Sequence, residues 1–164
     1  MDILIRPARP AEYEEIGELT ARAYLADGLL LSGADDPYLP VLRDVARRAA
    51  EAEVLVAEED GRIRGAVTFA AQGPYAELAG AGEAEFRMLA VSAAARGRGA
   101  GEALVRACVE RARALPDCRA LVLSTQPAMR SAHRLYERLG FTRAPERDWE
   151  PVPALTLLAY ALTL

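Results

Sequence analysis

Hydrophobic and polar positions change their spacing several times along the chain, and each spacing predicts a different element. Residues 3–6 form a short apolar stretch that Pro7 ends, which predicts a strand, and the spacing after Pro10 predicts a helix. Residues 27–40 are rich in turn-forming types, whereas residues 41–52 regain helical spacing. The first third should therefore run strand, helix, loop, helix.

Two β-rich runs occupy the middle of the chain, at residues 54–58 and 62–71. An Asp-Gly pair lies between them and is a strong signal for a tight hairpin turn, so we expect two antiparallel strands. A Gly-rich segment over 72–82 precedes residues 84–91, whose length and apolar composition favour a central strand.

Helix and strand alternate in the last third. Residues 99–115 and 128–139 carry helical spacing, and residues 120–123 and 154–164 read as strands. No internal repeat or linker interrupts this order. We therefore expect one mixed α/β domain over residues 1–164.

Composition and charge then limit the function classes. The chain has 164 residues, of which 52% are hydrophobic, enough for one sizeable core. Its 20 basic and 24 acidic residues give a formal net charge of −4, so no overall basic field favours nucleic acid or an anionic membrane. No apolar run reaches the ~18 residues that a membrane helix needs, and no signal-peptide core follows Met1.

The two cysteines, Cys108 and Cys118, stand apart from any His or Cys cluster, which argues against both a disulfide framework and a zinc site. We expect a cytoplasmic protein with no metal, no nucleic-acid partner and no membrane partner. A homodimer is compatible with the sequence.

The stretch 88–104 carries the most specific chemistry. A buried strand leads through a short turn into a helix whose start contains Gly97, Gly99 and Gly101. Free N–H groups at a helix N-terminus, the absence of side chains and the helix dipole together favour an anion such as a pyrophosphate. The even glycine spacing does not match a Rossmann G-x-G-x-x-G, and the Gly-Lys-Ser/Thr of a P-loop is missing.

Two motifs in this half of the chain resemble those of one family. Arg96, Gly99 and Gly101 match the pattern R/Q-x-x-G-x-G/A, and a predicted helix ends in Leu135-Tyr136-x-x-x-Gly140-Phe141. Both are similar to markers of the GCN5-related N-acetyltransferase family, in the same order and context.

The resemblance implies a mixed, mostly antiparallel sheet of six to seven strands, flanked by about four helices and splayed between its central strands. It also implies acetyl-CoA as cosubstrate. The main chain of Leu89, Ala90 and Val91 would run along the pantetheine arm. The pyrophosphate would lie on the backbone of residues 97–102. The expected cofactor-binding residues of the turn are Arg96, Gly97, Arg98, Gly99, Ala100, Gly101 and Glu102.

In the family the tyrosine of the second motif lies near the thioester sulfur, so Tyr136 is the expected acid for the departing thiolate. A phenol has a pKa of ~10 and a thiol ~8.5, so full proton transfer is uphill by ~2 kcal/mol and hydrogen bonding should matter more. The alternative is an aromatic anchor between helix and sheet. Many members have an asparagine where this chain has Met129, which puts one coenzyme A contact in doubt.

Acetyl transfer to a lysine-type amine also needs a base, because deprotonation at pH 7 costs ~4.6 kcal/mol. Glu83 and Glu85 lie on one face at the start of the central strand, and Glu85 is the first choice; solvation, or pairing with Arg87, is the alternative. His133 reads as a partly exposed helix residue, and Trp149 as an aromatic wall of an acceptor pocket or a core anchor.

The resemblance implies an N-acetyltransferase that moves the acetyl group directly to a primary amine of a small molecule or peptide. Neither cysteine lies in a motif for an acyl-enzyme. The acidic balance leans toward cationic acceptors. Two alternatives stay open, a non-catalytic acyl-CoA sensor of the same fold and a protein N-terminal acetyltransferase.

Overall fold

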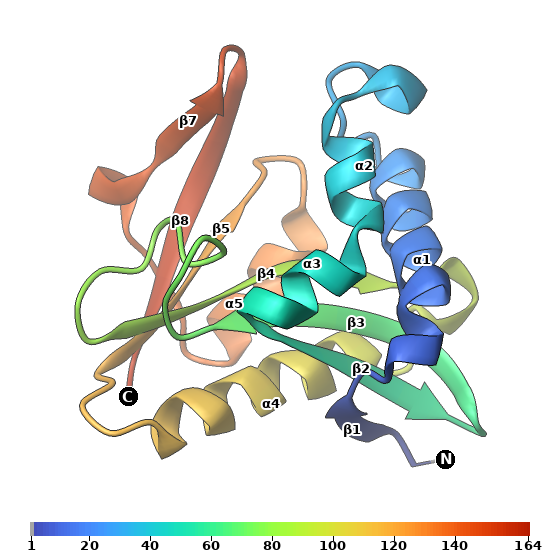
Figure 1. Ribbon diagram of the computed structural model, residues 1–164. Coiled ribbons are helices and arrows are strands. Elements are labelled where there is room, and N and C mark those ends of the chain that lie inside the picture. Colours follow the sequence, from blue (N-terminus) through green and yellow to red (C-terminus); the bar gives the residue numbers. More distant parts are fainter. Residues whose placement is uncertain (1) are drawn as a thin grey trace.

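A twisted sheet of eight strands forms the middle layer of the computed structural model, which describes residues 2–164 (Figure 1). Its order is β1-β2-β3-β4-β5-β8-β6, and β7 pairs with β8. Every pairing is antiparallel except the one between β4 and β5. The strands are β1 Leu4–Pro7, β2 Glu53–Glu59, β3 Arg62–Ala70, β4 Glu83–Val91, β5 Ala120–Thr125, β6 Thr142–Arg143, β7 Trp149–Val152 and β8 Leu155–Thr163.

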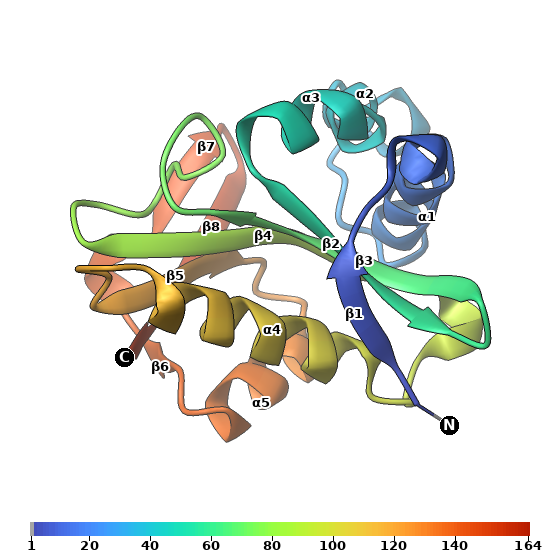
Figure 2. The same cartoon turned by 60° about the horizontal axis from the view of Figure 1, so that its bottom comes forward.

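Helices cover both faces of the sheet, as Figure 2 shows most clearly. One face carries α1 Tyr13–Ala26, α2 Tyr38–Arg43 and α3 Val45–Glu51, and the other carries α4 Ala100–Ala114 and α5 Arg130–Arg138. Short 3₁₀ turns occur at Pro10–Glu12, Gly33–Asp35, Ala93–Ala95 and Pro145–Arg147. Within residues 2–164, no helix has the length and apolar character needed to cross a membrane.

The predicted mixed, mostly antiparallel architecture is confirmed, with two differences in detail. The sheet has eight strands instead of six to seven, because the segment after Phe141 forms the two short strands β6 and β7. The helix expected over 41–52 is divided at Asp44, whose carboxylate accepts a hydrogen bond from the N–H of Arg47 at 3.2 Å. This side-chain cap starts α3 and raises the helix count to five.

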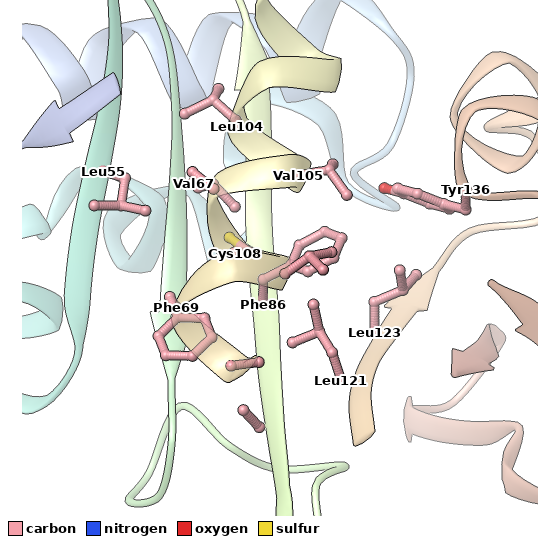
Figure 3. Packing of buried hydrophobic residues seen from close by; sticks show 14 of the residues in the cluster. Leu55, Val67, Phe69, Phe86, Leu104, Val105, Cys108, Leu121, Leu123 and Tyr136 are labelled. Atoms are coloured by element: carbon pink, nitrogen blue, oxygen red, sulfur yellow. The ribbon is translucent and has the colours of Figure 1, made fainter. Parts of the chain in front are cut away.

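The largest core lies between α4 and the sheet (Figure 3). One face of α4 is buried along its whole length, which explains its helical spacing. Phe86 of β4 packs edge-on against Tyr136 of α5 and against Phe141, with ring centroids 5.9 and 6.2 Å apart. These aromatic contacts fix α5 beside the central strands.

Two irregularities of β4 shape the middle of the sheet. Its pairing with β5 is limited to three residues, Glu83–Glu85, after which β4 stays with β3 and β5 stays with β8. Between the pairs Thr68–Arg87 and Ala66–Ala90, β4 also has one more residue than β3, and Met88 there has a φ of 56°. The sheet is therefore splayed between β4 and β5, beside a β-bulge.

Candidate active site

Two hollows lie at the splay between β4 and β5. The first, which we call the cradle cleft, has a volume of about 810 Å³ and is lined by the end of β4, the turn into α4 and the start of α5. The second, which we call the apolar pocket, has a volume of about 540 Å³ and lies between the loop after α1 and the β7–β8 hairpin. Tyr24, Leu29 and Met129 line both hollows, so the two meet at a common wall.

The turn into α4 presents backbone N–H groups to the cradle cleft. Gly97 and Gly99 have φ values of 77° and 90°, a left-handed conformation that glycine adopts without steric cost. A Cβ at either position would meet nothing within 4 Å, so the backbone here is open to an approaching group. The first helical bond runs from the N–H of Ala103 to the carbonyl of Gly99 at 3.0 Å, which leaves the preceding N–H groups of the helix unpaired.

Nine of the ten residues expected to contact the cofactor line this one cleft: Leu89, Ala90, Val91, Arg96, Gly97, Gly99, Ala100, Gly101 and Glu102. Arg98 is the exception, because its guanidinium lies 3.0 Å from the buried carboxylate of Glu59.

The cations of the turn are less available than the sequence suggested. Arg96 donates two hydrogen bonds to Asp27, of 2.9 and 2.8 Å, and Arg98 forms a salt bridge with Glu59. Arg138 at the other side of the cleft pairs with Glu102 at 2.7 Å. Arg130 also lines the cleft, and no carboxylate among residues 2–164 lies within salt-bridge distance of it.

The apolar pocket is walled mainly by hydrophobic side chains. They come from the loop after α1, from β4, from the end of β5 and from the β7–β8 hairpin: Leu29, Leu30, Leu31, Pro37, Met88, Met129, Trp149, Pro151, Val152, Pro153, Leu155 and Leu157. Charged lining residues are few, namely Asp36, Glu77, Glu85 and Arg87.

Glu85 is the most deeply buried of these charged groups, with 2% of its surface exposed. Its Oε1 accepts hydrogen bonds from the N–H groups of Leu78 at 2.8 Å and Ala79 at 3.0 Å. No donor among residues 2–164 bonds to Oε2, and Glu85 lines the pocket. Burial raises the pKa of the carboxyl above its ordinary value, although the two backbone hydrogen bonds oppose this.

Neither alternative interpretation of Glu83 and Glu85, solvation or pairing with Arg87, agrees with the structure. Glu85 is not solvated, and it does not pair with Arg87, which instead donates to Glu77 at 2.6 Å and to the Tyr38 hydroxyl at 3.2 Å. Glu83 pairs with Arg147 at 2.8 Å, and this bond lowers the pKa of the Glu83 carboxyl. Glu83 is thus held by a structural ion pair.

Tyr136 lies in the aromatic cluster between α5 and the sheet, with 3% of its surface exposed, and it is not among the residues that line either hollow. Burial raises the pKa of its phenol. Burial, the Tyr38 phenol and more weakly the Tyr136 phenol also raise the pKa of Tyr24, which lines both hollows.

Several residues of the site carried no distinct signal in the sequence. Gln126, just after β5, donates from Nε2 to the carbonyl of Leu29 at 2.8 Å and so holds the α1–α2 loop against the splay. His133 lines neither hollow; it is the partly exposed helix residue that the sequence predicted, and its Nε2 lies 3.0 Å from the carbonyl of Gln126. Three successive leucines at 29–31, within a turn-rich loop, were the one available hint of an apolar wall.

Trp149 lines the apolar pocket, and its Nε1 donates to the Ser124 hydroxyl at 2.9 Å. Met129, at the position where asparagine is common, lies at the start of α5 on the wall shared by both hollows. A thioether there is polarizable and adaptable, and suits a packing contact better than a directed hydrogen bond.

Most of the chain matches one known protein family. The sequence profile of the Acetyltransferase (GNAT) family matches residues 14–141, which is most of the chain. The chain belongs to this family. Within residues 2–164, no group of three or more His, Cys, Asp or Glu side chains is arranged to hold a metal ion.

Among curated proteins, this GNAT chain is similar to N-acetylaspartate synthetase of Danio rerio, with 39% identity over 72 residues. The match covers 44% of the chain but only 25% of that protein, so the chain spans about a quarter of this relative.

Solved structures share the fold at lower identity. The GNAT chain is similar to a ribosomal-protein-alanine N-acetyltransferase from Brucella melitensis, with a TM-score of 0.73, 22% identity and coverage of 98% of this chain and 99% of that one. It is also similar to a phosphinothricin acetyltransferase from Sinorhizobium meliloti in complex with acetyl-CoA, with a TM-score of 0.73, 22% identity and coverage of 100% and 89%.

Proposed function

We propose that residues 1–164 act as one N-acetyltransferase domain, which moves an acetyl group directly from acetyl-CoA to a primary amine. The observation that carries this proposal is the meeting of the two hollows at the splay, with the open Gly-rich start of α4 in one and the buried Glu85 in the other. Membership of the GNAT family supports the donor, since a structural neighbour holds acetyl-CoA.

The cradle cleft is the proposed donor site. The unpaired N–H groups at the start of α4 would receive the pyrophosphate, where the helix dipole adds positive potential. The main chain of Leu89, Ala90 and Val91 is free of β5 at this point and would bond to the pantetheine arm. Arg130 would form an ion pair with another phosphate group of coenzyme A, because the other arginines of the cleft are already paired with carboxylates.

Glu85 is the proposed base. Its free Oε2 would take the proton of the ammonium, and the neutral amine nitrogen would then form a bond to the thioester carbonyl carbon. Backbone N–H groups at the Met88 bulge would stabilise the oxyanion, and the C–S bond would break to release coenzyme A. The Tyr136 hydroxyl would donate to the departing sulfur.

A Gly101→Glu substitution tests the donor site. Gly101 has an ordinary helical conformation, its added Cβ would meet no atom closer than 3.6 Å, and an acid in the first turn of a helix is favourable. The variant should fold, while its carboxylate would repel the pyrophosphate and weaken acetyl-CoA binding by about 100-fold or more, measured by calorimetry. Gly101→Ala is the matched control, since it adds one carbon without charge, and it should keep its affinity.

Turnover with a broad panel of amines then separates an enzyme from a non-catalytic acyl-CoA sensor. Release of coenzyme A coupled to an acetylated amine supports the enzyme. Tight acetyl-CoA binding with no transfer to any small amine or peptide N-terminus would favour the sensor. A cytoplasmic location and a homodimer stay predictions from the sequence.

A further inference from the structure

We infer that the apolar pocket takes a primary amine carried on an uncharged, apolar body about the size of an aromatic ring, and that it discriminates against acceptors with a carboxylate. This inference rests on the proposed acetyltransferase function and names the acceptor class of the same site. The acidic composition of the chain favoured cationic acceptors in general, and the pocket narrows this class to apolar amines.

The walls of the pocket provide apolar surface with few unpaired polar groups. The indole N–H of Trp149 is already donated to Ser124 at 2.9 Å, so the ring offers the pocket its apolar surface. Leu29 and Leu30 face it from the loop after α1, and that loop is held in place by the bond from Gln126 to the Leu29 carbonyl. A volume of about 540 Å³ suits a small ligand.

Two carboxylates that line the pocket, Asp36 and Glu85, have no cationic partner among the described residues, whereas Arg87 is paired with Glu77 at 2.6 Å. Asp36 accepts from the N–H groups of Ser32 at 3.0 Å and Tyr38 at 2.9 Å, one on each carboxylate oxygen. Glu85 accepts at Oε1 only, and no donor among residues 2–164 bonds to its Oε2. An ammonium group therefore has a partner in the pocket.

A carboxylate on the acceptor has no such partner. The single arginine of the pocket is bonded to Glu77 and Tyr38, so an acceptor carboxylate would meet three acidic side chains and no free cation. Burial of a charge without a partner costs several kcal/mol, which exceeds the gain from apolar contact.

The rim of the pocket is apolar as well. Leu31 on the loop after α1 is 56% exposed and Val152 on the β7–β8 hairpin is 47% exposed, and both line the pocket. Two exposed aliphatic side chains at the opening of one pocket favour an apolar body that extends out to the rim.

Binding of three amines tests this inference: one with a ring only, one with a ring and a carboxylate, and one without a ring. Calorimetry with the protein saturated with coenzyme A would compare 2-phenylethylamine, phenylalanine and 1,4-diaminobutane. We expect 2-phenylethylamine to bind at least about 10-fold more tightly than either of the others. Tighter binding of phenylalanine or of the diamine, or no binding of any of the three, would overturn the inference.

Rim variants provide a second, independent measurement. Leu31→Ser and Val152→Ser should each weaken 2-phenylethylamine binding several-fold, up to about 10-fold, through lost apolar contact. Leu4→Ser is the matched control, because Leu4 is 54% exposed on β1 and does not line the pocket. Equal effects at Leu4 and at the rim would contradict the assignment.

Because these measurements report binding, they separate the two proposals. Selective 2-phenylethylamine binding without acetyl transfer would refute the catalytic proposal and leave the ligand class standing. Efficient acetyl transfer that prefers amino acids or diamines would support the catalytic proposal and refute the inferred ligand class.

Discussion

Glu85 lines the apolar pocket, is deeply buried and has one carboxylate oxygen without a hydrogen bond among the described residues. Its two backbone donors hold Oε1 in place, so Oε2, the proposed base, does not need to be positioned by a substrate. Such a group is costly to a folded protein when it is charged, because burial disfavours the anion. A role in catalysis therefore explains the position of Glu85 at the splay better than a contribution to folding stability does.

Glu85→Gln should therefore change activity and stability in opposite directions. Loss of the base is expected to lower kcat/KM by about 100-fold or more at pH 7. Because the folded-state pKa of Glu85 is raised, its neutral form is the stabilising one, and the uncharged Gln should raise the melting temperature at pH 7. The gain should shrink as the pH falls through the carboxyl pKa, where the wild-type side chain is also neutral.

The pH profile provides the check on this interpretation. Wild-type kcat/KM should rise with pH through a pKa above the ordinary carboxyl value, and this limb should be missing from the Gln variant. A variant that keeps the same rising limb would exclude Glu85 as the base.

Tyr136→Phe tests a hydroxyl whose ring is otherwise a packing element. The contacts of the ring with Phe86, Phe141 and Tyr160 do not depend on the hydroxyl, so the fold and the acetyl-CoA affinity should be unchanged. We expect kcat to fall about 10-fold or more, because the departing sulfur loses its donor. Full activity would leave Tyr136 an aromatic anchor only.

At the scale of elements, one arginine connects segments of the chain that lie around the apolar pocket. Arg147 lies just before β7 and donates to both carboxylate oxygens of Glu83 and to the carbonyl of Leu78. Leu78 belongs to the same loop that donates its N–H groups to Glu85. The hairpin that carries Trp149 is thus tied to the loop that orients the proposed base.

Arg147→Met should loosen this connection while leaving the cradle cleft intact. We expect the acceptor KM to rise several-fold with little change in acetyl-CoA affinity, and faster hydrogen exchange at the amides of Leu78 and Ala79. Arg111→Met is a suitable control, since Arg111 of α4 pairs with Glu53 of β2 and lines neither hollow. Equal effects of the two substitutions would indicate a general loss of stability.

For the whole molecule, ion pairs set the response to acid. The hydrogen bond from Arg6 lowers the pKa of Glu12 from 4.5 to about 2, and those from Arg147 and Arg143 lower the pKa values of Glu83 and Asp148. A carboxyl with a lowered folded-state pKa stabilises the fold above its ordinary pKa, and this contribution is lost as the pH falls through the lowered value.

The melting temperature should therefore decline between about pH 4.5 and pH 2. Arg6→Met, which removes the main partner of Glu12, should lower stability at neutral pH and make the decline shallower. Thermal unfolding followed by circular dichroism across this range checks both points. A decline of equal steepness in the variant would mean that Glu12 is not a major contributor.

Local patterns predicted local features well. The helical spacing of residues 99–115 produced α4, the Asp-Gly pair produced the β2–β3 hairpin, and the spacing of Gly97, Gly99 and Gly101 indicated the open turn. Each of these depends on residues close together in the chain, where dihedral preference and periodicity decide the outcome.

The apolar pocket could not be predicted in this way. Its walls come from the loop after α1 and from the last hairpin, and they face each other only because β8 is inserted between β5 and β6. The bulge at Met88 likewise depends on the register between β3 and β4, and the sequence of neither strand reveals it. Long-range pairing decides these features.

The wall that Tyr24, Leu29 and Met129 share has a consequence for inhibitors. Each proposed substrate would reach this wall from its own hollow, so neither needs the other in place to enter, and a ternary complex would assemble in either order. A conjugate with an aryl-ethylamine joined to the sulfur of coenzyme A would extend past the place where the two hollows meet and occupy both at once. Its affinity should greatly exceed that of either half, because the second contact becomes intramolecular.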